Sequence, residues 1–157
     1  IRDSYLDSPE AKLDQTGTYR AIDEMQRFLD YFPNSERAKQ AQDIIFELQD
    51  KLVYKELLNA QLYYNLGNYM GNNYQSAIIT AQNALKEYPY TRYKETLSML
   101  ILKSKYQEAV QSIEEKKPER FRDVIDEYYS FINDYPSGEY SKEAENIFKV
   151  ANKYVKD

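Results

Sequence analysis

Residues 60–90, AQLYYNLGNYMGNNYQSAIITAQNALKEYPY, constrain the fold most, because they predict two helices joined by a tight turn. Apolar residues recur every three or four positions on both sides of Gly71-Asn72-Asn73, as in amphipathic helices that flank a turn. The two apolar stripes are Leu62, Leu66, Tyr69 and Met70, then Tyr74, Ala77, Ile78, Ala81, Ala84 and Leu85. Pro89 ends the second helix, since proline cannot continue one. The stretch therefore predicts a helical hairpin.

Small residues in this hairpin predict that its two helices pack closely, since helices approach to about 8 Å only where the side chains between them are small. Their spacing resembles the tetratricopeptide repeat, a helical hairpin of about 34 residues. The matching positions are Tyr63, Leu66, Gly67, Met70, Tyr74, Ala77, Ala81, Ala84 and Pro89. The turn is about two residues shorter than in that repeat, and Met70 replaces an aromatic residue. The match predicts a fold and leaves the ligand open.

Similar junctions elsewhere predict further copies of the hairpin. The segments FLDYFPNSERAKQA, ALKEYPYTRYKET and FINDYPSGEYSKEA share an aromatic-proline pair followed by a polar helix start. We therefore expect repeat helices to end near Pro33, Pro89 and Pro136. A capping helix over residues 139–156 would cover the open end of the array. Residues 1–16 carry no sustained stripe and predict a loop or a short helical turn.

An uninterrupted run before Gly67 predicts one unusually long helix. No glycine or proline occurs within residues 34–66, and apolar residues recur there at helical spacing. We expect one helix, or two nearly collinear helices, around residues 35–70, with a length of about 50 Å at 1.5 Å per residue. This helix explains why Pro33 and Pro89 are farther apart than the length of about 34 residues that is usual for such a repeat.

Three helix starts complete the prediction. Ser35 is the expected N-cap of the long helix, and Thr91 is expected to cap the helix after Pro89. Pro118 suits the first position of the next helix. The sequence as a whole predicts an all-α fold, in which residues 1–157 form a single domain of tetratricopeptide-like hairpins stacked in a right-handed superhelix.

The absence of cysteine and histidine excludes several kinds of site. A Cys–His or Ser–His–Asp nucleophile, a zinc site and a histidine metal site all need residues that the chain lacks. Catalysis would depend on carboxylates, lysines or tyrosines, and the carboxylates Asp123, Asp126 and Glu127 lie on the predicted exterior of a helix. The net charge of −5 disfavours a nucleic-acid partner. We expect no catalytic, metal or cofactor site.

Tyrosine supplies the candidate binding residues, at 17 of 157 residues. Tyr63, Tyr74, Tyr88 and Tyr128 are expected to fill gaps between stacked helices. Tyrosines beside turns or off the main stripes are candidates for protein binding, because Tyr and Arg are enriched at interface hot spots. The candidate protein-binding residues are Tyr69, Tyr90, Arg92, Tyr93, Tyr129 and Tyr140.

Arg92 is the expected polar anchor of this set. It lies between Tyr90 and Tyr93, and a guanidinium beside two rings can pair with a carboxylate while it stacks. The alternative for Arg92 is a solvated side chain at a helix start.

Three features of the chain carry a more specific resemblance. They are the opening DQTGTYRAIDEMQRFLDYFPNSERAKQA, the elongated helix after it, and YYNLGNYMGNNYQSAIITAQNALKEYP. Together they resemble the later repeats of the BamD family, outer-membrane assembly lipoproteins also described as competence lipoproteins. The family's positions are filled by Asp14-Gln15-Thr16, Ala21, Phe28-Leu29 and Pro33-Asn34-Ser35. The resemblance covers roughly residues 8–156, and a complete member has a lipidated cysteine and further repeats upstream.

The resemblance implies a non-enzymatic scaffold on the periplasmic face of the outer membrane, held there by a lipid anchor outside this sequence. The later repeats would dock the periplasmic POTRA modules of the barrel-forming subunit, within the machinery that folds and inserts β-barrel proteins. Unfolded outer-membrane proteins are a second class of partner that the resemblance implies. It implies no cofactor.

Two other binding functions stay open on the residues alone. A generic repeat adaptor would hold an extended peptide in its concave groove, often by clamping a terminal carboxylate, and only Asn65 and Asn68 are suitably placed for this on the central helix. Glycan binding through surface aromatics is disfavoured by the lack of tryptophan. An enzyme is the least favoured class.

Overall fold

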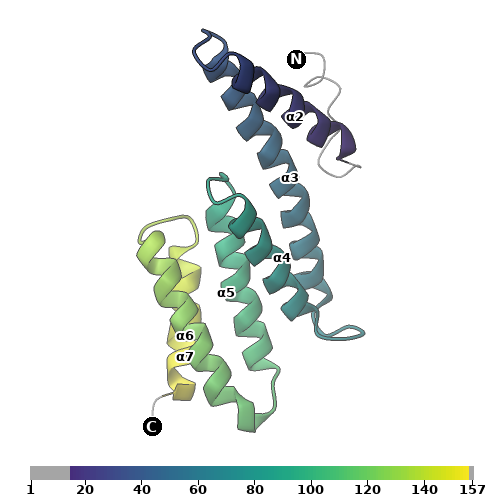
Figure 1. The fold of residues 1–157 in the computed structure, drawn as a ribbon. Helices are drawn as coiled ribbons and strands as arrows, with labels where there is room; N and C mark the ends of the chain where they lie inside the picture. The colour runs from purple at the N-terminus through teal and green to yellow at the C-terminus, as the bar shows by residue number, and fades with distance from the viewer. Residues whose placement is uncertain (1–14, 156–157) are drawn as a thin grey trace.

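The computed structural model describes residues 15–155, and every regular element within them is helical (Figure 1). The elements are α2 (Thr16–Tyr31), α3 (Ala38–Leu66), α4 (Asn73–Glu87), α5 (Lys94–Val110), the short 3₁₀ helix η1 (Glu114–Lys116), α6 (Lys117–Asp134) and α7 (Ser141–Val155). The all-α prediction is confirmed. The loop or turn expected over residues 1–16 lies mostly outside the described residues, as does residue 156 of the expected capping helix.

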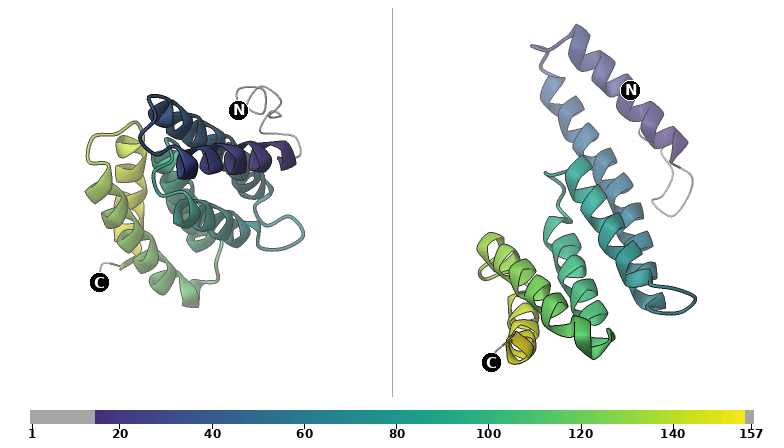
Figure 2. Two further views of the ribbon diagram at one scale, coloured as in Figure 1. Left: turned by 45° about the horizontal axis from the view of Figure 1, so that its top comes forward. Right: turned by 60° about the horizontal axis from the view of Figure 1, so that its bottom comes forward.

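The helices form two layers (Figures 1 and 2). Each helix runs antiparallel to the one before it and packs against it. Further contacts join α3 to α5 and α5 to α7, which places these three helices in one layer. The helices α2, α4 and α6 make up the other layer. Stacked hairpins of this kind are typical of a tetratricopeptide-like array, in which each unit contacts mainly its neighbours. The handedness of the superhelix stays a prediction.

Three clusters of buried side chains hold the layers together. The first lies between α2 and α3, the second between α3, α4 and α5, and the third between α5, α6 and α7. Representative buried residues are Met25 and Ile45 in the first, Ile78 and Leu97 in the second, and Leu102 and Phe121 in the third. The core is therefore distributed along the array.

The predicted long helix is confirmed as α3, a continuous helix of 29 residues. Its buried residues are spread along the helix and are Ala41, Ile45, Leu48, Leu52, Val53 and Ala60. Figure 1 shows α2 packed along the first half of α3 and α4 packed along its second half. The bounds are narrower than expected, because α3 begins at Ala38 and ends at Leu66.

A glycine turn ends α3 earlier than the predicted limit near residue 70. Gly67 adopts a left-handed φ of 56°, and an added Cβ there would lie 2.7 Å from the Tyr74 hydroxyl oxygen. The backbone conformation therefore favours glycine, and an added Cβ would also have to displace the end of the Tyr74 side chain. Gly71 has a φ of 133°, and the Asn72 side chain accepts a hydrogen bond from the Gln75 N–H at 3.2 Å, which caps α4. The predicted turn is present, but it spans residues 67–72, and Asn73 already begins α4.

The prediction that an apolar stripe before this turn packs against the neighbouring helix is wrong. Leu62, Leu66, Tyr69 and Met70 are all exposed, Met70 at 89%. Tyr69 and Met70 lie beyond the end of α3, so helical spacing does not decide their direction. Leu62 and Leu66 are on the face of α3 that is turned away from its neighbours.

The tyrosines expected to fill gaps differ in their burial. Tyr74 is buried and meets the Tyr64 ring edge-on, at 5.8 Å between ring centroids. Tyr88 and Tyr128 are half-buried, whereas Tyr63 is exposed. The expectation for Tyr63 is wrong, because Tyr64 takes the position that faces α4.

Three junctions between the layers have the same backbone geometry. Phe32, Tyr88 and Tyr135 have φ/ψ values of −132°/59°, −128°/67° and −132°/65°, and each precedes a proline. Proline disfavours helical geometry in the residue before it, so the helix must end there. Each of these residues still donates its N–H to the carbonyl four residues earlier, at 2.8–2.9 Å. The repeated turn follows directly from the repeated aromatic-proline pair.

Three expected helix starts are corrected. Arg37, rather than Ser35, is the N-cap of α3, and its N–H donates to Ser35 Oγ at 3.2 Å. Tyr93, rather than Thr91, is the N-cap of α5, and its N–H donates to Thr91 Oγ1 at 3.2 Å. Both hydroxyls thus shape the turn two residues before the cap. Pro118 is at the second rather than the first position of α6, because η1 runs directly into that helix.

Replacement of Gly67 by alanine should lower the free energy of unfolding by about 2–3 kcal/mol. A left-handed φ costs a residue with a Cβ about 1–2 kcal/mol, and displacement of the Tyr74 ring adds to this loss. Urea unfolding followed by circular dichroism measures the change. Gly71→Ala is the control, because its φ is also positive but no atom lies within 4 Å of the added Cβ. Equal losses in both variants would contradict a contribution from the Tyr74 contact.

Candidate protein-binding site

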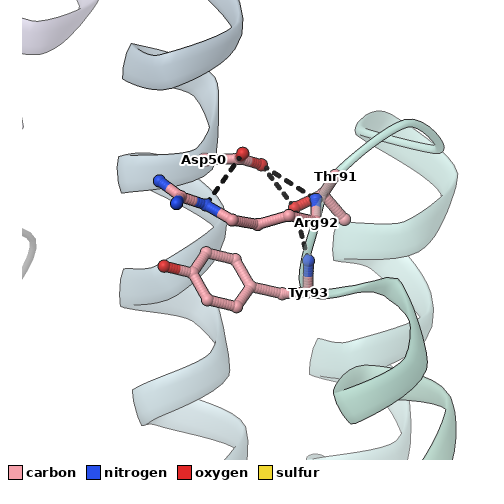
Figure 3. Close-up of polar contacts among 4 residues, drawn as sticks. All are labelled: Asp50, Thr91, Arg92 and Tyr93. Atoms are coloured by element: carbon pink, nitrogen blue, oxygen red, sulfur yellow. Dashed lines mark hydrogen bonds and ion pairs between the residues drawn. The ribbon is translucent and has the colours of Figure 1, made fainter. Parts of the chain in front are cut away.

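A polar clasp joins α3 to the loop that begins α5 (Figure 3). The carboxylate of Asp50 on α3 accepts a hydrogen bond from Thr91 Oγ1 at 2.6 Å and a longer one from the Arg92 N–H at 3.4 Å. Its second oxygen lies 3.3 Å from Arg92 Nε. We call Asp50, Thr91 and Arg92 the α3–α5 clasp. It connects segments that are 41 or 42 residues apart in the sequence.

The Asp50 carboxylate is paired within the protein. The side chain of Asp50 is only 16% exposed, so its charge needs partners within the protein. Thr91 is buried and supplies a hydroxyl, and Arg92 supplies the opposite charge. The carboxylate also lies at the N-terminal end of α5, where the helix dipole stabilises negative charge.

Arg92 is held in place without being covered. Its guanidinium carbon lies 5.5 Å from the centroid of the Tyr93 ring, and that ring packs on Tyr54 of α3 at 5.5 Å. The Arg92 side chain is still 65% exposed, and its neighbour Tyr90 is 87% exposed. In Figure 3 the terminal nitrogens of the guanidinium lie beyond the contact with Asp50. The arrangement presents a fixed cation and an exposed ring to a partner.

The structure brings three of the six predicted binding residues together, Tyr90, Arg92 and Tyr93, at the α4–α5 junction. Tyr69 is exposed in the turn between α3 and α4. Tyr129 is on α6, where its ring packs on Phe148 of α7 at 5.5 Å. The six residues therefore do not form one surface.

Tyr140 has a structural role at the next junction. Its N–H donates to Glu95 Oε1 at 3.5 Å, and its hydroxyl lies 3.4 Å from the hydroxyl of Thr96. Here too an acidic residue of one helix, α5, contacts the loop that begins the next helix of the same layer. The contact resembles the clasp between Asp50 and Thr91.

Two residues at or near the clasp were not predicted from the sequence. Asp50 is a charged residue within a long helix, and no local pattern points to a partner 41 positions away. Phe46 is 44% exposed on α3 beside this junction. The run Ile44-Ile45-Phe46 could have indicated an exposed apolar residue, because three consecutive residues of a helix cannot all face the core.

Residues 15–155 contain no group of three or more acidic residues placed to hold a metal ion. Within the same residues, no helix has the length and apolar character that crossing a membrane would require.

Comparison with known families adds one match. The model of the YfiO family, described as outer membrane lipoprotein, matches residues 3–101. The match includes α2, α3, α4 and the start of α5, and therefore the whole clasp. No curated protein matches the chain.

A double-mutant cycle between Asp50→Asn and Thr91→Val should give a coupling of about 1–2 kcal/mol in the free energy of unfolding. The reason is that a hydrogen bond to a partly buried charged group contributes about that much. Urea unfolding of the two single variants and the double variant measures the coupling. The control pair is Glu145 and Lys149, which lie 3.5 Å apart with both side chains more than half exposed, and should couple by less than about 0.5 kcal/mol. Additive losses at Asp50 and Thr91 would contradict the clasp.

Proposed function

The chain belongs to YfiO, the BamD-like family of outer membrane lipoproteins, and on this basis we propose that it is a non-enzymatic scaffold of the outer-membrane β-barrel assembly machinery. In this proposal it acts at the periplasmic face of the outer membrane. Its partner is the periplasmic POTRA region of the barrel-forming subunit, and unfolded outer-membrane proteins are a second class of partner.

The observation that carries the proposal is the exposed pair Tyr90 and Arg92 at the clasp, within the part of the chain that matches the family. Interface hot spots are enriched in Tyr and Arg. Arg92 is held by Asp50 and by the Tyr93 ring, so little side-chain freedom is lost when a partner binds. A carboxylate of the partner could pair with the outer edge of the guanidinium while its neighbours pack on Tyr90.

The other candidate residues extend this proposal over a wider surface. Tyr69 and Tyr129 are exposed on separate parts of the array, and Tyr140 is half-buried at the α6–α7 junction. In a large partner, separate modules could reach separate parts of a rigid helical array. We place Tyr90, Arg92 and Tyr93 at the centre of the proposed interface.

The alternative, a carboxylate clamp for an extended peptide, has less support. Asn65 accepts a hydrogen bond from Gln61 at 3.0 Å, and Asn68 donates one to Gln111. Both amides therefore have partners within the chain.

Tyr90→Ala should weaken binding to the purified POTRA region from the same organism by at least about fivefold, equivalent to about 1 kcal/mol. Isothermal titration calorimetry at two salt concentrations measures the dissociation constant. Arg92→Ala should weaken binding at least as much and reduce the salt dependence, because it removes the charge at the proposed contact.

Tyr31→Ala is the matched control, because Tyr31 is 80% exposed and is the last residue of α2, a helix that contributes nothing to the clasp. It should leave the dissociation constant unchanged. No binding by the unaltered chain would reject the POTRA partner. Binding that Tyr90→Ala and Arg92→Ala leave intact would retain the partner and reject this site.

A further inference from the structure

Two neighbouring cavities lie along the middle of α3. The first has a volume of about 260 Å³ and lies between α3 and the loop that connects α4 to α5. The second has a volume of about 350 Å³ and lies between α2, α3 and the end of α4. Glu87 and Tyr88 line both cavities. We call the two cavities together the α3 groove.

The groove follows from the length of α3. That helix has 29 residues, whereas α5, in the same layer, has 17. Figure 1 shows that α2 covers the first part of α3 and α4 covers the second part. Residues from the start of α2, the middle of α3 and the end of α4 together line the second cavity.

Aromatic rings form much of the wall. Phe46 and Tyr90 line the first cavity, Tyr19 lines the second, and all three are exposed. Tyr88 is half-buried where the two cavities meet. Exposed rings around a cavity offer faces that attract a cation, because the face of an aromatic ring is the negative side of its quadrupole.

The ionisable groups of the wall are mainly acidic. The acids are Asp50, Glu56 and Glu87, and the one base in the wall is Lys55. Asp50 is already paired with Arg92, so Glu56 and Glu87 supply the further negative charge. Burial and the neighbouring carboxylates of Glu87 and Glu56 raise the pKa of the Tyr88 hydroxyl, which agrees with a negative potential in the groove.

We infer that the α3 groove binds an extended segment of a partner protein through arginine or lysine side chains. The cationic groups lie against the rings of the wall and pair with Glu87 and Glu56. An extended segment can reach both cavities because Glu87 and Tyr88 line each of them. This inference does not rest on the POTRA proposal, and it concerns a ligand of opposite charge to one that Arg92 would bind.

The test uses a synthetic peptide, acetyl-Gly-Arg-Ala-Phe-Ala-Arg-Gly-amide, and a copy in which neutral citrulline replaces both arginines. Titration of the ¹⁵N-labelled chain, followed by backbone amide chemical shifts, gives the site and the dissociation constant. The arginine peptide should shift amides around Glu87 and Tyr88. The citrulline peptide should bind at least about fivefold more weakly, because it lacks the charge.

Glu87→Gln and Glu56→Gln should each weaken binding of the arginine peptide by about threefold or more, since each removes one attractive charge and keeps the side-chain shape. Glu115→Gln is the control, because Glu115 is exposed in η1, outside the groove. Circular dichroism and thermal unfolding check that all three variants are folded.

Equal affinity for the arginine and citrulline peptides would overturn the inference. So would shifts confined to α6 and α7, or no shifts at millimolar peptide. Glu56 and Glu87 are not part of the proposed POTRA site. If the chain does not bind the POTRA region, the peptide titration can still support the groove, and if the peptide does not bind, the POTRA proposal still stands.

Discussion

The steric clash between a proline ring and the residue before it ends α2, α4 and α6, and so determines three of the places where the described chain changes layer. It acts at Phe32, Tyr88 and Tyr135, which share one backbone conformation. Because the turn is the same at these three junctions, α3, α5 and α7 each return antiparallel to the helix before them and come into contact within one layer. The glycine turn after α3 and the segment around η1 make the other two reversals. The clasp depends on the same turn, since Thr91 and Arg92 reach Asp50 only when the loop after Tyr88 is folded in this way.

The array is irregular because α3 is much longer than the other helices of its layer. A regular array would place α2 and α4 side by side over a helix of ordinary length. Here α3 is long enough for each of them to cover a different part, and the acidic, ring-lined groove lies where they meet. One local property of the sequence, a run without glycine or proline, thus produces both the long central helix and the two cavities beside it.

Periodicity predicted the helices and the aromatic-proline junctions well, because these depend on local residue preferences. It failed for Met70, because the positive φ of Gly67 ends α3 and changes the direction of the chain. It failed for Leu62, because no other described helix covers that face of α3. It also failed for Ser35 and Thr91, whose hydroxyls can serve either a cap or the turn before it. The sequence pointed to Arg92 and its flanking rings but not to Asp50. A contact between distant segments depends on how the helices stack, and no local pattern records that.

Asp50, Thr91 and Tyr90 belong to the clasp or its edge and also line the groove. A partner carboxylate that pairs with the outer edge of the Arg92 guanidinium would share its positive charge with Asp50, and the less neutralised Asp50 carboxylate would then attract a cation in the groove more strongly. Thermodynamic linkage makes this effect reciprocal, so a basic segment in the groove would strengthen binding at Arg92 by the same factor. The shared carboxylate would let one helical scaffold favour the assembly in which both partners are present over either complex alone.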